Sequence, residues 1–260
     1  MLQVRVIPCL LLRDESLVKT VKFKNPSYIG DPVNAIKIYN EKEVDELIFL
    51  DIAASRERRR PPFEKIREIA DECFMPLAYG GGITTIEDIR EIFNIGVEKI
   101  SLNASALQNP ELVREAAEVF GAQSVVVAID VKKSLWGKYE VYNHTTGKSA
   151  KIDPVEYARQ MEQLGAGELL VTSVDKEGTW EGYDTELLKR ITSSVNIPVI
   201  AHGGAGHIED FARAVAVGGA SAVATGSMVV YQKKGLGVLI NFPKRETLDD
   251  ILDANGIPIE

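Results

Sequence analysis

The sequence predicts an α/β fold, a (β/α)8 TIM barrel built from two homologous half-barrels. Apolar runs of strand length alternate with stretches of helical periodicity along the chain, and eight such strand–helix units can be recognised. This alternation is typical of parallel strands joined by helices, and eight parallel strands close into a barrel. Matching stretches also recur at a near-constant spacing, which divides the units into two sets of four.

Each predicted strand is a short run rich in leucine, isoleucine, valine or alanine, as buried parallel strands are. In chain order the runs occupy residues 3–11, 46–53, 75–81, 99–105, 124–131, 168–174, 197–204 and 221–227. None of these runs is long enough to span a bilayer as a helix, so we expect no membrane segment.

Several helices between these strands have recognisable starts. Asp31, Asn109 and Asp153 each precede a proline, so we expect each to cap a helix that begins at that proline. Thr84 and Glu87 have the spacing of a capping box, which predicts another helix start at this point.

The internal repeat is clearest at two pairs of positions that lie 122 residues apart, Glu46 with Glu168 and Gly82 with Gly204. The surrounding residues match as well, because "ELIFLD" recurs as "ELLVTS" and "MPLAYGGG" recurs as "IPVIAHGG". Several matches at one spacing indicate two homologous halves. We expect a single domain over residues 1–260, with half-barrels at about 1–122 and 123–245 and a C-terminal tail at 246–260.

Composition and charge narrow the class of protein. The formal net charge of −8 argues against nucleic-acid and membrane partners. The first residues lack the pattern of a secretion signal, and the two cysteines, Cys9 and Cys73, form neither a disulfide framework nor a zinc pattern. The three histidines show no metal spacing. We therefore expect a cytoplasmic enzyme or enzyme subunit that uses no metal and no other cofactor, with Cys9 as a small core residue.

Strands one and five superpose with a spacing of about 119 residues, and this pairing places Leu11 opposite Asp130. The chemistry of a (β/α)8 barrel lies at the carboxyl ends of its strands. Asp130 follows a wholly apolar strand that would desolvate it, so it is the candidate catalytic acid or base. The alternative is a carboxylate that only caps a neighbouring loop. Asp51, at the end of strand two, is expected to support another residue rather than to react.

Glycines follow several of the predicted strands and precede helices, where backbone N–H groups can hold an anion. Gly82 belongs to the first half, and Gly203, Gly204, Gly226 and Ser227 belong to the second. Two such sites related by the repeat suggest a ligand with two phosphate groups, although the glycines could simply shape the turns. The second-half site is the stronger prediction, because its residues follow the adjacent strands seven and eight.

A second pattern lies at the opposite, N-terminal face of the predicted barrel. Arg5, Glu46, Lys99 and Glu168 each stand at or just before the start of an apolar strand, so their side chains should converge near the barrel axis. Two cations and two anions can neutralise one another there. The simple interpretation is a salt-bridged plug, and the sharper one is a gate to a passage.

The loop after strand two carries "RERRR" at residues 56–60, on the face where chemistry is expected. A solvated run of charge is the default interpretation, although these arginines could also hold an anionic substrate or an acidic partner. His202, directly before Gly203, is a candidate polar contact to a ligand.

These motifs together resemble HisF, the cyclase subunit of imidazole glycerol phosphate synthase, a barrel built from two half-barrels. The stretches that carry the resemblance cover nearly every unit: "IPCL", "GDPV", "ELIFLDI", "GGGI", "KISLNA", "VVVAIDVK", "GAGELLVTSVDKEGTWEGYD", "IPVIAHGGAG" and "ATGS".

The resemblance implies a partner, a glutaminase subunit of HisH type that docks on the N-terminal barrel face and sends ammonia through the barrel. It also implies roles for residues of this chain. The gate of the family matches Arg5, Glu46, Lys99 and Glu168; the lysine of its mobile first loop matches Lys19; one phosphate site matches Gly82 and Asn103; and the other matches Gly178, Gly204, Gly226 and Ser227.

One departure from the family is chemically decisive. The cyclase uses two aspartates, of which Asp130 matches the second, whereas the first aligns with Leu11, which cannot carry a proton. Other replacements lie nearby: Thr20, Ala104, His144, Glu177 and His202. Asp14 is the only nearby carboxylate in sequence, and it should lie too far along the loop to replace the missing one.

This combination resembles a HisF-like branch that forms acetamidino sugars of surface polysaccharides such as O-antigen, with a separate sugar amidotransferase as a further partner. We therefore expect a HisF-like subunit that channels ammonia for amidation, and that binds a phosphorylated or sugar ligand. The alternative is the cyclase subunit of histidine biosynthesis. A different sugar-phosphate isomerase or lyase is a more distant alternative, and Leu11 also counts against the isomerase of the same pathway.

Overall fold

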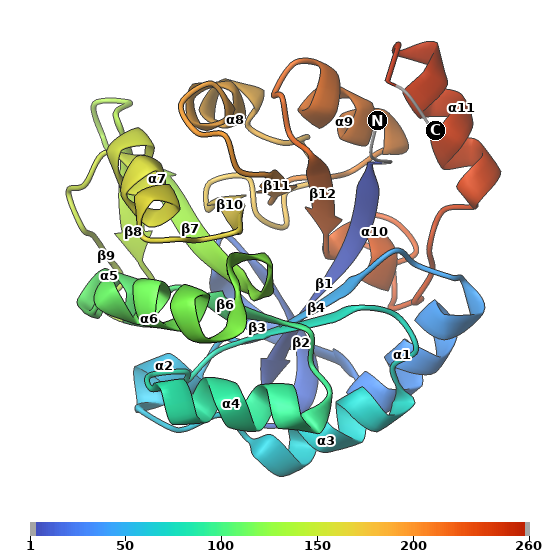
Figure 1. Ribbon diagram of the computed structural model, residues 1–260. Coiled ribbons are helices and arrows are strands. Elements are labelled where there is room, and N and C mark those ends of the chain that lie inside the picture. Colours follow the sequence, from blue (N-terminus) through green and yellow to red (C-terminus); the bar gives the residue numbers. More distant parts are fainter. Residues whose placement is uncertain (1–3, 258–260) are drawn as a thin grey trace.

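The computed structural model describes residues 4–257. Eight parallel strands form a closed barrel at its centre, and the helices lie around the outside (Figure 1). Around the barrel the strands are β1 (Arg5–Arg13), β4 (Leu47–Asp51), β5 (Leu77–Gly80), β6 (Lys99–Leu102), β7 (Val125–Lys133), β10 (Glu168–Ser173), β11 (Val199–His202) and β12 (Ala222–Thr225). The barrel closes where β12 pairs with β1, with Arg5 opposite Ala222. The predicted fold class is confirmed.

Helices connect the strands on the outer surface. They are α1 (Pro32–Glu41), α2 (Ala54–Glu57), α3 (Phe63–Glu72), α4 (Ile86–Ile95), α5 (Ala104–Gln108), α6 (Glu111–Phe120), η1 (Ala122–Ser124), α7 (Pro154–Gln163), α8 (Thr185–Thr192), α9 (Ile208–Ala216), α10 (Ser227–Val230) and α11 (Arg245–Ala254). Within the described part of the chain, no helix has the length and apolar character needed to cross a membrane.

Two of the predicted helix caps are confirmed and two are wrong. The carboxylates of Asp31 and Asp153 accept backbone N–H groups at the starts of α1 and α7. The capping box of α4 uses Thr85 and Asp88, one residue beyond the predicted pair. Helix α6 begins after Pro110 rather than at it, so Asn109 is not its cap.

An antiparallel extension follows the first strand of each half. After β1 the chain forms β2 (Ser16–Val21) and β3 (Lys24–Gly30), and after β7 it forms β8 (Tyr139–Asn143) and β9 (Lys148–Ser149). Both extensions rise from carboxyl ends of barrel strands, so they stand beside the face where barrel chemistry occurs.

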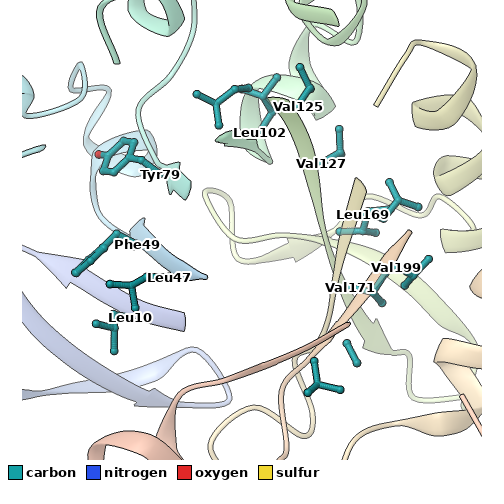
Figure 2. Packing of buried hydrophobic residues seen from close by; sticks show 14 of the residues in the cluster. Leu10, Leu47, Phe49, Tyr79, Leu102, Val125, Val127, Leu169, Val171 and Val199 are labelled. Atoms are coloured by element: carbon teal, nitrogen blue, oxygen red, sulfur yellow. The ribbon is translucent and has the colours of Figure 1, made fainter. Parts of the chain in front are cut away.

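The core has two layers, because successive side chains of a strand point to opposite sides. The outer layer, between barrel and helices, includes Leu10, Phe49 and Tyr79 (Figure 2). The inner layer fills the barrel and includes Ile7 and Cys9, so the predicted burial of Cys9 is confirmed at 1% exposure.

The end of the chain packs onto the barrel. Leu252 of α11 is buried with Val4, Ala212 of α9, and Ile257. Arg245 at the start of α11 pairs with Asp45, 2.9 Å away, in the segment that leads into β4. The C-terminal tail is therefore held by the same domain that contains the barrel.

Candidate functional site

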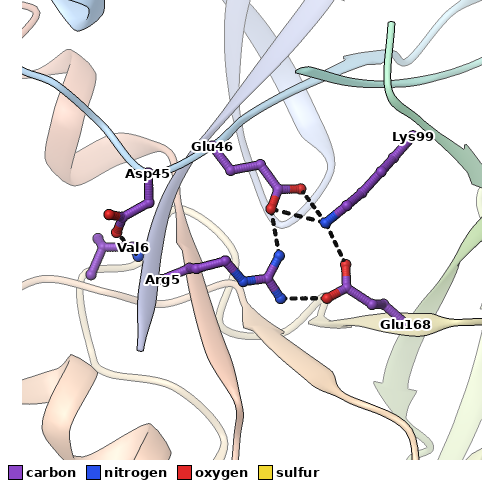
Figure 3. A network of polar contacts seen from close by, with 6 residues as sticks. All are labelled: Arg5, Val6, Asp45, Glu46, Lys99 and Glu168. Atoms are coloured by element: carbon purple, nitrogen blue, oxygen red, sulfur yellow. Dashed lines mark hydrogen bonds and ion pairs between the residues drawn. The ribbon is translucent and has the colours of Figure 1, made fainter. Parts of the chain in front are cut away.

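The charged ring, composed of Arg5, Glu46, Lys99 and Glu168, lies at the N-terminal end of the barrel (Figure 3). The guanidinium of Arg5 donates to both carboxylates, one through each terminal nitrogen. Lys99 Nζ donates to both oxygens of Glu46, at 3.1 and 3.0 Å, and to Glu168 at 2.9 Å. Each carboxylate thus bridges the two cations, and all four side chains meet as predicted.

The charged ring is only partly open to solvent. The Glu46 side chain is 3% exposed, whereas that of Arg5 is 27% exposed. Burial by itself disfavours the charge of Arg5, but attraction to Glu168 and Glu46 outweighs it and raises the pKa of Arg5. The charged ring sets two basic side chains against two carboxylates, and this pairing compensates for their removal from water.

The barrel interior beyond the charged ring is apolar. Its buried lining is formed by Ile7, Cys9, Ile48, Ala78, Val126, Ala128, Leu170, Ile200, Ala222 and Ala224. Four of these residues are alanines, which have short side chains. A small neutral molecule would meet no charged group between the ring and the far end of this lining.

A large cavity of about 250 Å³ lies at the carboxyl ends of the strands. Leu11 lines it from β1 and Asp130 lines it from β7, so the two positions matched by the repeat face the same space. Asp14, in contrast, is exposed in the turn after β1, where it pairs with Arg13. The structure therefore offers no carboxylate from the end of β1 to this cavity.

Asp130 is 7% exposed, and its contacts differ from those of a loop cap. Asn103 Nδ2 donates to Asp130 Oδ2 at 3.0 Å, and His144 Nδ1 lies 3.6 Å from the same oxygen. Asp51 accepts the backbone N–H groups of Ala53 and Ala54, each at 2.9 Å, so it holds the start of the segment that follows β4.

The β2–β3 hairpin is fastened over the cavity by Glu177, which follows β10. The Glu177 carboxylate accepts hydrogen bonds from Lys19 Nζ, from Thr20 Oγ1 at 3.1 Å and from the Phe23 N–H at 3.1 Å. The Glu177 side chain is 2% exposed and that of Lys19 is 7% exposed. The sequence did not predict this contact, because 158 residues separate its two charged groups.

The second-half glycine site is assembled as predicted. Lys19 and Glu177 line a small cavity of about 10 Å³ together with Gly178, Gly203, Gly204, Gly226 and Ser227. Gly204 has φ of +119°, and a Cβ there would stand 2.2 Å from the carbonyl oxygen of Gly182. Only glycine fits this close approach of two backbones. The small cavity is too tight for a phosphate group in this arrangement.

The first-half glycine site opens onto the large cavity, which Gly82 and Asn103 both line. The Gly82 N–H, which could hold an anion, donates instead to Ser55 Oγ at 3.2 Å. The two predicted glycine sites thus differ. The second-half site is closed around Lys19, whereas the first-half site is open to the large cavity and its Gly82 N–H is hydrogen-bonded to the Ser55 hydroxyl.

The arginine-rich segment divides into two groups. Arg59 pairs with Glu57 at 2.6 Å and Arg60 with Asp88 at 2.8 Å, so these two arginines have partners within the chain. Arg56 lines the large cavity and donates to the His144 carbonyl at 2.9 Å. Only part of the segment therefore faces the site.

His202 also lines the large cavity, where Thr172 Oγ1 lies 3.0 Å from its Nδ1. Burial and the nearby Lys19 lower the pKa of His202 to about 4, so its imidazole is neutral near neutral pH. Within residues 4–257 no group of His, Cys, Asp and Glu side chains is arranged to hold a metal ion.

A family model described as "Histidine biosynthesis protein" matches residues 5–235. A Pseudomonas aeruginosa protein, provisionally named imidazole glycerol phosphate synthase subunit hisF2, is 50% identical over 249 residues, which cover 96% of this chain and 99% of that protein. The imidazole glycerol phosphate synthase subunit HisF of Alkaliphilus metalliredigens is 45% identical over 233 residues, covering 90% of this chain and 92% of that subunit. The subunit of the same name from Endomicrobium trichonymphae is 48% identical over 233 residues, 90% of this chain and 89% of that subunit.

These relatives are named as subunits of one synthase, and residues 5–235, which the family model matches, span the charged ring, both glycine sites and both strand ends that face the large cavity. The chain belongs to the HisF-containing family of histidine biosynthesis proteins.

Proposed function

We propose that this chain is the ammonia-using subunit of an imidazole glycerol phosphate synthase-type complex. Ammonia from a HisH-type glutaminase, docked at the N-terminal face, passes the charged ring and the apolar interior and reacts in the large cavity. The proposal rests on one observation: the charged ring, the apolar lining and the cavity with Asp130 lie in sequence along one barrel.

The names of the relatives favour one acceptor for the ammonia. They describe subunits of imidazole glycerol phosphate synthase, so they support the cyclase of histidine biosynthesis better than the sugar amidation that we expected first. Its substrate is an aminoimidazole-carboxamide bisphosphate, so binding would require the small cavity around Lys19 to open for one phosphate group and the Gly82 N–H to exchange Ser55 for the other.

Amidation of a sugar stays a second candidate because of Leu11. A leucine in the cavity wall cannot accept or donate a proton, and loss of a general acid or base lowers a rate by ~10²–10⁴-fold. An acceptor activated by a separate sugar amidotransferase would not need a carboxylate at this position.

Turnover of the bisphosphate with ammonium salt tests the proposal, with Leu11→Asp as the matched variant. We expect slow formation of imidazole glycerol phosphate by the natural chain and a rate about tenfold or more higher in Leu11→Asp. Absence of product from both proteins would refute cyclase chemistry and leave the sugar acceptor. Fast turnover that Leu11→Asp does not improve would show that residue 11 has no part in the reaction.

A further inference from the structure

Attack by ammonia on a carbonyl carbon requires a group that moves protons. The nitrogen lone pair forms the C–N bond while the C=O π electrons move to oxygen, and the nitrogen must then lose a proton. If the oxygen leaves as water, nitrogen has lost two protons in all and oxygen has gained two. The proposed function therefore requires an acid–base group that can reach both atoms in the large cavity.

Most titratable groups that line the cavity are already engaged. Asp51 accepts two backbone N–H groups and lies 3.5 Å from Arg59. Glu177 accepts hydrogen bonds from Lys19 and its neighbours in the β2–β3 hairpin. His202 is buried, and because its pKa is lowered to about 4 it is a weak base.

His144 is the exception. Its side chain lines the large cavity and is 19% exposed, and its Nδ1 lies 3.6 Å from Asp130 Oδ2. Among residues 4–257, no hydrogen bond occupies the Nε2 of His144. At 3.6 Å the Asp130 carboxylate lies just beyond hydrogen-bond distance of Nδ1, and a small side-chain movement that closes this gap would give the arrangement of an oriented general base, with the second nitrogen open.

The segment that carries His144 is well fixed. Asn143 Oδ1 accepts the N–H and the hydroxyl of Thr145, at 3.0 and 2.6 Å, and Arg56 donates to the His144 carbonyl at 2.9 Å. Asn103 holds the other member of the pair by donating to Asp130 at 3.0 Å. The Asp130 carboxylate and the backbone that carries His144 are thus both held by contacts of their own, which favours a preorganised site.

We infer that His144 and Asp130 form a proton-transfer pair that serves ammonia addition in the large cavity, where Leu11 provides no acid or base. This inference rests on the proposed function, which brings ammonia to the cavity. His144 Nε2 takes the proton from the attacking nitrogen, and Asp130 stabilises the resulting imidazolium. The imidazolium then returns the proton to the departing oxygen, and a second transfer completes the loss of water.

The test compares turnover of the bisphosphate with ammonium salt in the natural chain, His144→Ala and His207→Ala. His207 is an exposed histidine outside the large cavity, so its replacement is the matched control. We expect His144→Ala to lower kcat about 100-fold with little change in KM, and added imidazole to restore part of the lost rate. His207→Ala keeps the natural rate.

An unchanged kcat in His144→Ala would overturn the inference, as would a lowered kcat that imidazole fails to restore in a protein with natural thermal stability. His144→Gln, which keeps more of the side-chain volume, serves if the alanine variant does not fold.

Carbethoxylation with diethyl pyrocarbonate separates this inference from the proposed function, because it needs no turnover. At alkaline pH we expect His144 to react faster than His207, and Asp130→Asn to slow only the reaction at His144. If the natural chain forms no product but His144 still reacts faster than His207 and is slowed by Asp130→Asn, the cyclase proposal is refuted while the His144–Asp130 pair is supported. Equal reaction of His144 in the natural chain and in Asp130→Asn would refute the pair whatever the acceptor.

Discussion

Leu11 and Asp130 occupy matched positions in the two halves of the barrel and line the same cavity, yet only Asp130 can accept or donate a proton. Asp130 is held by Asn103 and faces His144, whereas Leu11 offers only methyl groups. The sequence predicted this difference, because both residues end apolar strands at matched repeat positions. It did not predict the neighbour of Asp130, since His144 arrives from a turn whose path depends on the β7–β8 hairpin.

Stability should depend on His202 in a defined pH range. The folded-state pKa of about 4 lies below the ordinary value of 6.5, so the unfolded chain binds this proton first as the pH falls. The contribution of His202 is complete above pH 6.5 and is lost as the pH falls from there toward 4. Between about pH 7 and pH 5, the unfolding free energy should therefore fall by about 2 kcal/mol more in the natural chain than in His202→Gln.

Urea denaturation of both proteins at several pH values measures this difference. Parallel loss of stability in the natural chain and in His202→Gln would show that His202 is not held neutral by the fold.

Among the elements, the β2–β3 hairpin has the strongest link to the site. Glu177 joins it to the loop after β10, and the same contact places Lys19 beside the second-half glycines. An unpaired buried charge destabilises the folded state. Removal of either Lys19 or Glu177 should therefore increase the mobility of both the β2–β3 hairpin and the loop after β10.

Replacement of Glu177 by alanine removes the acceptor of the Phe23 N–H and leaves Lys19 without its carboxylate. We expect hydrogen exchange at the Phe23 amide to become about tenfold or more faster, as loss of a buried hydrogen bond predicts. Glu181→Ala is the control, because Glu181 lies on the same loop but is largely exposed, 3.7 Å from Lys176. Equal exchange in Glu177→Ala and the natural chain would mean that other contacts hold the hairpin.

The strands were predictable because each is a distinct apolar run, and the caps at Asp31 and Asp153 were predictable because Asp-Pro is a strong local signal. The shift of the α4 cap to Thr85 was not, since adjacent threonines offer the same hydroxyl. The antiparallel hairpins were missed as well. Their residues are mostly polar, and their pairing depends on the barrel strands from which they extend.

For the whole molecule, the proposed function depends on two ends of one barrel acting together. The charged ring is closed by contacts that span the two halves, since Arg5 and Lys99 of the first half both reach Glu168 of the second. The sequence placed these four residues at strand starts, but only closure of the barrel brings them together.

Arg5→Met removes one of the two cations that bridge the carboxylates, so the charged ring should no longer close completely. With a HisH-type glutaminase present, we expect more glutamine to be hydrolysed for each product formed, because ammonia escapes before it reaches the cavity. Arg114→Met is the control, since Arg114 is an exposed side chain that pairs with Glu111 within α6. A ratio of glutamate to product that stays as in the natural complex would argue against a gate at this ring.

In the proposed function, ammonia travels inside the barrel from the charged ring to the large cavity. The most direct test of this route supplies the complex with a HisH-type glutaminase with glutamine labelled with ¹⁵N at the side-chain amide, together with excess unlabelled ammonium salt. Mass spectrometry of the imidazole glycerol phosphate then reports the source of the new nitrogen. We expect product enriched in ¹⁵N well above the bulk ammonium pool. Product with the isotopic composition of that pool would show that ammonia reaches the cavity from solvent.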